Sequence, residues 1–246
     1  MSRYWLNAKT KTSDPAAFAA QVETLCTLYA YTILLSALGV RVISCDEMTG
    51  IQALERAAPT QSMQTGQAER IEFEYVRHGT LSLIANFEVA SGQVIAPSLG
   101  PTRTEADFVA HIAQTVATDP DAPWLFITDQ LNTHQSESLV RLVAARGGLT
   151  DDLGVKGKTG VLQSLESRAA FLSDPTHQIQ FLYVPKHTSW LNQVEIWFSI
   201  LVRRVIKRGN FGSVDDLQAK ILAFVDYFNR TAKPFRWTYT GRPLQA

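Results

Sequence analysis

The stretch VPKHTSWLNQVEIWF, residues 184–198, decides the fold that the sequence predicts. It opens as the apolar end of a strand, is interrupted at Pro185, and continues as a helix with Thr188 or Ser189 as its N-cap. Apolar residues then recur every three or four positions and would face a core: Leu191, Val194, Phe198, Leu201 and Val205. Glu195 lies at the edge of that apolar face. Burial of its carboxylate would need a cation or hydrogen bonds, so it is either a salt-bridged helix residue or a functional one.

The composition is typical of a soluble globular protein, with 46% apolar and 19% charged residues among 246. The 23 Lys and Arg equal the 23 Asp and Glu, so any nucleic-acid-binding site would have to be a local patch. Cys26 and Cys45 have no metal-ligand spacing, which indicates unpaired thiols in a reducing compartment. Residues 1–5 show no signal-peptide pattern, and the longest weakly polar run, residues 28–40, is too short to span a bilayer. We therefore expect a soluble intracellular protein.

The first half of the chain predicts an arm and a helix over residues 1–38, followed by an antiparallel meander. Asp14-Pro15 is a helix-start signal. A short β-branched run then ends at Cys45-Asp46-Glu47, which places carboxylates at the C-terminal end of the first strand. A turn at His78-Gly79 leads into a second strand over residues 81–89, and Ser91-Gly92 turns into a third.

The second half alternates helices and strands. Thr102 or Thr104 would cap a helix that stops at Asp119-Pro120, and residues 124–127 form an apolar strand buried on both faces. Further segments are expected as a helix over 136–145, an insertion over 149–176 with a short helix at 165–172, a strand over 179–184, a helix over 214–229 and a tail over 233–246.

This order of elements is that of an RNase H-like α/β fold. It predicts a mixed five-stranded sheet with helices on both faces, in which the first and fourth strands lie side by side at the centre. The domain that contains it would extend over residues 39–232.

Three acidic residues could meet in that fold. Asp46 and Asp129 each follow an apolar strand, at the sheet edge where open α/β sheets gather ligands. Glu195, on a helix packed at the same edge, would be the third. Clustered carboxylates raise one another's pKa, and hard divalent cations such as Mg²⁺ relieve this repulsion. Two such ions, ~3.5–4 Å apart, would flank a phosphodiester. For each aspartate alone, a turn or capping role is the alternative.

Basic residues surround the segment that carries Glu195, and they would contact DNA phosphates or complement the helix dipole. They are Lys186, His187, Arg203, Arg204, Lys207 and Arg208. A glycine-rich loop carries Lys156 and Lys158 and is either a contact to the DNA backbone or plain surface. It is not a nucleotide-binding phosphate loop, because Asp152 stands where that motif needs its first glycine. For His134, five residues after Asp129, a structural hydrogen bond is favoured over a role in the site.

Three segments resemble the acidic motifs of DDE transposases, with the closest similarity to the bacterial insertion-sequence-630 family in the mariner-like superfamily. They are SCDE (44–47), TDQLNTH (128–134) and PKHTSWLNQVE (185–195). Four further segments resemble the same family: TGIQALER (49–56), RHGT (77–80), GPTRT (100–104) and KPFRW (233–237).

The resemblance implies a Mg²⁺- or Mn²⁺-dependent endonuclease and strand-transferase, with two ions held by Asp46, Asp129 and Glu195. It would cut DNA at the ends of a transposon and join the freed 3′-hydroxyl to a target, usually at TA. Double-stranded DNA is the expected partner, and the protein is expected to form a homodimer. No binding of a membrane or of a nucleotide is expected. The expected location is the bacterial cytoplasm, in association with the nucleoid.

Three features depart from the family pattern. Gln130 replaces a common Asn, the insertion 149–176 lengthens the separation of Asp129 from Glu195, and the family's N-terminal helix-turn-helix does not precede Met1. A truncated remnant that binds DNA or an intact transposase without cleaving is therefore the alternative, and a junction resolvase is a third hypothesis.

Overall fold

The computed structural model describes residues 14–150, 152–186 and 188–239. The predicted arm over residues 1–13, His187 and the end of the tail, residues 240–246, lie outside the described residues.

Helices and strands follow the predicted order. In chain order they are α2 (Pro15–Ala37), β1 (Arg41–Arg56), β2 (Tyr75–Glu88), β3 (Val94–Gly100), α3 (Glu105–Val116), β4 (Trp124–Thr128), α4 (Glu137–Arg146), α5 (Leu165–Leu172), β5 (Ile179–Tyr183), α6 (Val194–Leu201) and α7 (Val214–Arg230). Local signals explain several starts. Asp14 caps α2, Thr104 forms a capping box with Asp107 at α3, and Ser136 caps α4.

The five strands form one mixed sheet in the order β3-β2-β1-β4-β5. β1 pairs antiparallel with β2 and parallel with β4, and the β1–β4 register runs from Arg41↔Trp124 to Ser44↔Ile127. The first and fourth strands are therefore neighbours at the centre, and the predicted RNase H-like fold is confirmed.

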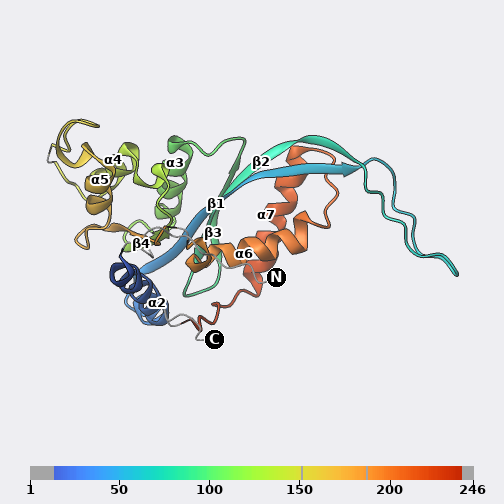
Figure 1. Cartoon of the computed structure of the whole chain (residues 1–246), viewed down its shortest axis with the longest axis horizontal. Helices are drawn as coiled ribbons and strands as arrows, with labels where there is room; N and C mark the ends of the chain where they lie inside the picture. The colour runs from blue at the N-terminus through green and yellow to red at the C-terminus, as the bar shows by residue number, and fades with distance from the viewer. Residues whose placement is uncertain (1–13, 151, 187, 240–246) are drawn as a thin grey trace.

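Helices cover both faces of the sheet, because side chains alternate along each strand (Figure 1). Ile43 and Cys45 of β1 belong to a core with residues of α3, α4 and α5. Val42 points to the opposite face, into a core with α2. Further along β1, Ile51 packs in a third core with α6 and α7. β1 thus contributes to every core of the domain.

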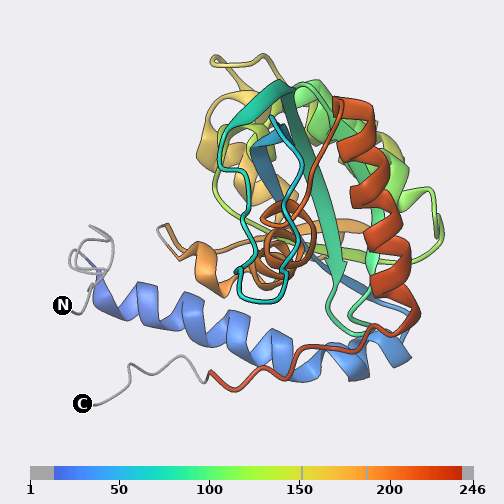
Figure 2. The same cartoon turned by 90° about the vertical axis from the view of Figure 1, so that its right-hand side faces the viewer.

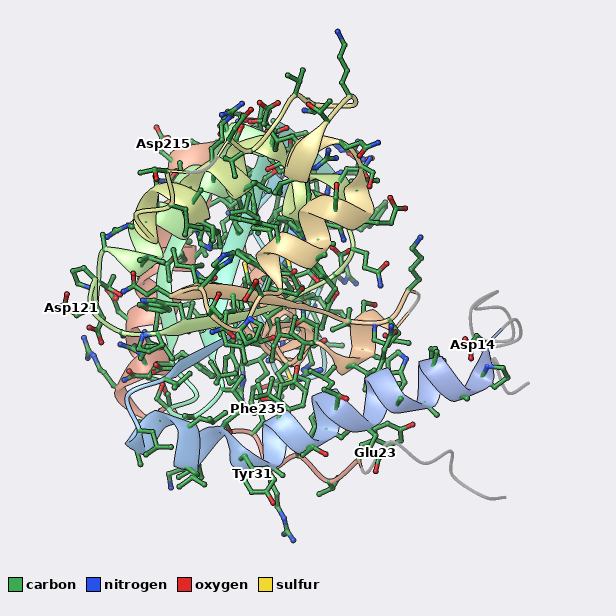
Figure 3. The ribbon with its side chains drawn as sticks, turned by 90° about the vertical axis from the view of Figure 1, so that its left-hand side faces the viewer. Asp14, Glu23, Tyr31, Asp121, Asp215 and Phe235 are labelled. Carbon is green, nitrogen blue, oxygen red and sulfur yellow. The ribbon has the colours of Figure 1, made fainter. Side chains whose placement is uncertain are left out.

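α2 packs one face on the sheet and leaves the other exposed. Val22, Leu25, Cys26 and Tyr29 are buried, whereas Tyr31 is 56% exposed (Figure 3). By length and apolar composition α2 could cross a bilayer, although this buried face makes it part of the core. The C-terminal segment runs beside it in Figure 2, and the ring of Trp237 lies 4.7 Å from that of Tyr29.

β1 and β2 are longer than the sequence predicted. β1 continues ten residues beyond Asp46, to Arg56, so Asp46 lies inside the strand and not at its C-terminal end. The predicted turn at His78-Gly79 is also wrong, because both residues lie inside β2. Beyond the two strands, the connecting hairpin over residues 57–74 projects from the body as an arm (Figure 1). The β1–β2 pairing has a register shift between Ala53 and Leu54, opposite Gly79.

The helix that carries Glu195 begins later than predicted. Thr188 does not cap it; the Thr188 hydroxyl donates to the Pro185 carbonyl at 2.6 Å instead. A 3₁₀ turn over Ser189–Leu191 follows, and α6 begins at Val194. After α6, the predicted continuous helix becomes a π-helical turn over Val202–Ile206.

Candidate active site

Asp46 and Asp129 lie close together because β1 and β4 are parallel neighbours. The last residue pair between these strands is Ser44↔Ile127, and two steps further along each chain are Asp46 and Asp129. Asp46 is only 8% exposed, and its Oδ1 accepts a hydrogen bond from the Glu47 amide at 2.8 Å. The register of the sheet therefore brings two acids from distant segments to one place.

A buried hydrogen-bond cluster fixes the start of α6 against β1. The Ser44 hydroxyl donates to Asn192 Oδ1 and accepts from the Val194 amide at 2.7 Å. The Asn192 amide nitrogen donates to the Cys45 carbonyl at 2.9 Å and lies 3.3 Å from Asp46 Oδ2. Because Val194 opens α6, this cluster sets where Glu195, in the first turn, stands relative to Asp46.

The three acids act on one another electrostatically. Burial, together with the charges of Asp129, Glu47 and Glu195, raises the pKa of Asp46 to about 7, although the hydrogen bond from the Glu47 amide acts in the opposite direction. Burial and the charge of Asp129 also raise the pKa of Glu195, which is half-buried. The site is therefore an acidic cluster that its surroundings leave only partly compensated.

Asp129 differs from the other two acids because a histidine neutralises it. Burial alone would raise the pKa of Asp129, but the hydrogen bond and charge of His134, and the Leu131 amide, hold it below its usual value. His134 Nδ1 lies 2.7 Å from Asp129 Oδ1, and His134 Nε2 lies 3.1 Å from both carboxylate oxygens of Glu47. Burial would lower the pKa of His134, yet the two carboxylates raise it to about 10. The predicted structural hydrogen bond of His134 is thus present.

The donor set suits a hard divalent cation in its chemistry. Within the described ranges, no three His, Cys, Asp or Glu side chains are gathered closely enough to hold a metal ion. The available donors of Asp46, Asp129 and Glu195 are nonetheless all carboxylate oxygens, which Mg²⁺ prefers. The raised pKa values of Asp46 and Glu195 indicate a local deficit of positive charge that a cation would relieve.

The predicted basic residues all lie at the surface where the structure describes them. Exposed side chains are those of Lys156, Lys158, Lys186, Arg203, Arg204, Lys207 and Arg208. The ammonium group of Lys156 lies 3.8 Å from Glu105 and 4.0 Å from Glu137, so it has carboxylate neighbours of its own. The predicted contact residue His187 lies outside the described residues.

Sequence reasoning did not assign Ser44, Asn192 or Glu47 to the surroundings of the acids, and it considered His134 only for a structural hydrogen bond. Ser44 and Asn192 lie at a sequence separation of 148, and Glu47 and His134 at a separation of 87. Arg103 was missed as well; it is exposed, and its charge lowers the pKa of Asp129. Only His134 carried a signal, its position shortly after Asp129.

Comparisons with known proteins give one family and one fold. The family described as DDE superfamily endonuclease matches residues 41–218. No curated protein matches the sequence.

Three solved structures are similar in fold. The Mos1 mariner paired end complex with Mn has a TM-score of 0.55 at 12% identity, over 92% of this chain and 59% of that one. The Mos1 strand transfer complex gives 0.54 at 13% identity, over 95% and 58%. The catalytic domain of Mos1 mariner transposase gives 0.51 at 11% identity, over 95% and 87%. The chain thus spans 59% of the length of the chain in the paired end complex.

Proposed function

The chain belongs to the DDE superfamily endonucleases, and from this premise we propose that it is the catalytic domain of a DNA transposase of the insertion-sequence-630 family. The domain would extend over residues 39–232, with the insertion 149–176, and it would cleave DNA at transposon ends and transfer the freed 3′-hydroxyl into target DNA at TA sites. One geometric observation supports this proposal above the others. The parallel register of β1 and β4 brings Asp46 close to Asp129, and hydrogen bonds to Ser44 and Asp46 hold the start of α6, which carries Glu195, against β1.

Each acid has a distinct environment in which to hold a cation. Asp46 is nearly excluded from water, Glu195 projects from the first turn of α6, and Asp129 is oriented by His134. When bound, two divalent ions would activate the attacking oxygen and stabilise the leaving one. Mos1 structures with Mn and with Mg are similar in fold, and on this basis we propose that this chain uses one of these metals.

Strand transfer of a pre-cut DNA end tests the proposal directly. A duplex with a free 3′-hydroxyl bypasses recognition of the transposon end, so the described domain can be assayed without a separate recognition region. With Mn²⁺ we expect joined products in a plasmid target, concentrated at TA dinucleotides, and none with EDTA. DNA binding without joining or nicking would favour the non-catalytic remnant. Preferential cleavage of branched DNA would favour a resolvase.

DNA contact by the basic residues after α6 makes a separate prediction. A plot of the logarithm of the DNA association constant against log salt has a negative slope, to which each neutralised phosphate contributes about −0.9. We expect the double variant Arg203→Gln/Arg204→Gln to reduce the magnitude of this slope by about 1–2. Fluorescence anisotropy over a salt series measures it. Arg141→Gln is the matched control, since Arg141 pairs with Glu137 on α4 and should leave the slope unchanged. An unchanged slope in the double variant would mean that the two arginines do not contact DNA and only complement the helix dipole.

A homodimer is also proposed, on the strength of the arm. Its end exposes large apolar side chains, among them Phe73 at 81% and Met63 at 76%, which a second copy could cover. Sedimentation equilibrium of the parent and of Phe73→Ser, each with and without DNA, tests this. A monomer under all conditions would contradict it.

A further inference from the structure

We infer that Glu47 and His134 are positioning residues: Glu47 anchors the His134 ring, and the ring fixes the Asp129 carboxylate for metal binding. This inference rests on the proposed function, because it assigns Asp129 to a divalent cation. Neither residue would itself bind the ion, since both ring nitrogens of His134 are already directed at carboxylate oxygens.

The three side chains form a linear series of contacts, from Glu47 through His134 to Asp129. Glu47 Oε1 and Oε2 each lie 3.1 Å from His134 Nε2, and His134 Nδ1 lies 2.7 Å from Asp129 Oδ1. The side chain of His134 is 0% exposed and that of Glu47 is 2% exposed, whereas that of Asp129 is 40% exposed. The chain therefore runs from the interior outward and ends on the carboxylate that solvent, or an ion, can reach.

The ring of His134 is also held from its other sides. The ring of Phe108, on α3, has its centroid 4.2 Å from that of His134. The Tyr183 hydroxyl, at the end of β5, donates to the His134 carbonyl at 2.9 Å. With the backbone and ring both fixed, Nδ1 can present its proton in only one direction, which leaves one oxygen of Asp129 free of this contact.

A second buried histidine shows that burial alone does not produce this arrangement. His111 is 1% exposed and its Nδ1 lies 2.7 Å from the Ser98 hydroxyl, so its partner is neutral. His134 instead joins two carboxylates, one of them buried, an arrangement that is costly unless every group is paired. Histidine and carboxylate partners beyond the first ligands orient metal-binding groups in many proteins, and their loss costs ~10–100-fold in metal affinity.

Two substitutions of His134 separate its two contacts. In His134→Asn the amide nitrogen can replace Nδ1, which retains the bond to Asp129 and gives up the one to Glu47. In His134→Gln the amide nitrogen can replace Nε2, which retains the contact with Glu47 and leaves Asp129 unheld. We expect Mn²⁺ affinity, measured by electron paramagnetic resonance of free Mn²⁺, to fall ~10–100-fold in His134→Gln. In His134→Asn, which keeps the bond to Asp129 but loses its anchor on Glu47, we expect a smaller decrease, similar to that of Glu47→Ala.

Glu47 provides a second pair in case the histidine variants unfold. Glu47→Gln keeps an acceptor for Nε2 and should retain Mn²⁺ affinity, whereas Glu47→Ala removes the anchor and should weaken it. His111→Asn is the matched control for removal of a buried imidazole, and it should destabilise the fold without changing Mn²⁺ affinity. Equal affinities in His134→Asn and His134→Gln, or in Glu47→Gln and Glu47→Ala, would overturn the inference. A parent that binds no Mn²⁺ would overturn the proposed function itself, which is a distinguishable result.

Discussion

The amide variants Asp46→Asn, Asp129→Asn and Glu195→Gln are each expected to lower metal-dependent strand transfer by ~10³-fold or more. Each replacement removes a negative oxygen donor while it keeps the shape of the side chain. Metal ions contribute several kcal/mol of transition-state stabilisation, and a loss of that size corresponds to about this change in rate. Single-turnover joining of a pre-cut end, with Mn²⁺ in excess, measures the rate directly.

A carboxylate outside the site provides the control for this series. Glu137→Gln makes the same chemical change on α4, where Glu137 pairs with Arg141, and it should leave joining unchanged. If one of the three site variants joined DNA as fast as the parent, its acid would have to be removed from the proposed metal site.

Asp46→Asn should stabilise the metal-free protein by about 2–4 kcal/mol above pH 8. The folded protein raises the pKa of Asp46 from 3.8 to about 7, and a difference of about three pKa units corresponds to ~4 kcal/mol. Because the folded pKa is raised, the cost of the charge is absent below pH ~4 and grows as pH rises from ~4 to ~7. It is complete above pH 7. The variant's advantage should follow the same course in urea denaturation at several pH values.

Two comparisons make the stability result specific. Mg²⁺ should stabilise the parent and not the variant, because the cation compensates the buried charge that the variant lacks. Asp107→Asn should show the opposite sign, since hydrogen bonds from Thr102 and Thr104 lower the pKa of Asp107 and favour its charged form. A parent and Asp46→Asn variant of equal stability at pH 8 would contradict the assignment of Asp46 as an uncompensated buried charge.

The sequence could predict those elements whose ends are set by neighbouring residues. Thr104 and Asp107 complete a capping box three residues apart, so the start of α3 was visible in the sequence. The start of α6 was not, because the Val194 amide bonds to Ser44, which lies 150 positions earlier. The length of β1 was also hidden, since its outer half is stabilised by pairing with β2 across residues 57–74.

The candidate site divides in the same way. Asp46, Asp129 and Glu195 could be proposed because acids near apolar strands and helices are a local signal, strengthened by family resemblance. The contact between the supporting residues Glu47 and His134 could not be predicted. These residues are 87 positions apart in the sequence, and only the fold brings them together. Whether the three acids bind metal stays a prediction.

The register shifts of β1 affect the direction in which the distal hairpin, residues 57–74, leaves the sheet. They occur between Met48 and Ile51 and between Ala53 and Leu54, so two interruptions of the strand pairing separate Asp46 from the distal hairpin. Bulges interrupt the ladder locally and allow a strand to bend there. The strand can therefore change direction between Asp46 and the distal hairpin, while the segment around Asp46 is held between β2 and the start of α6.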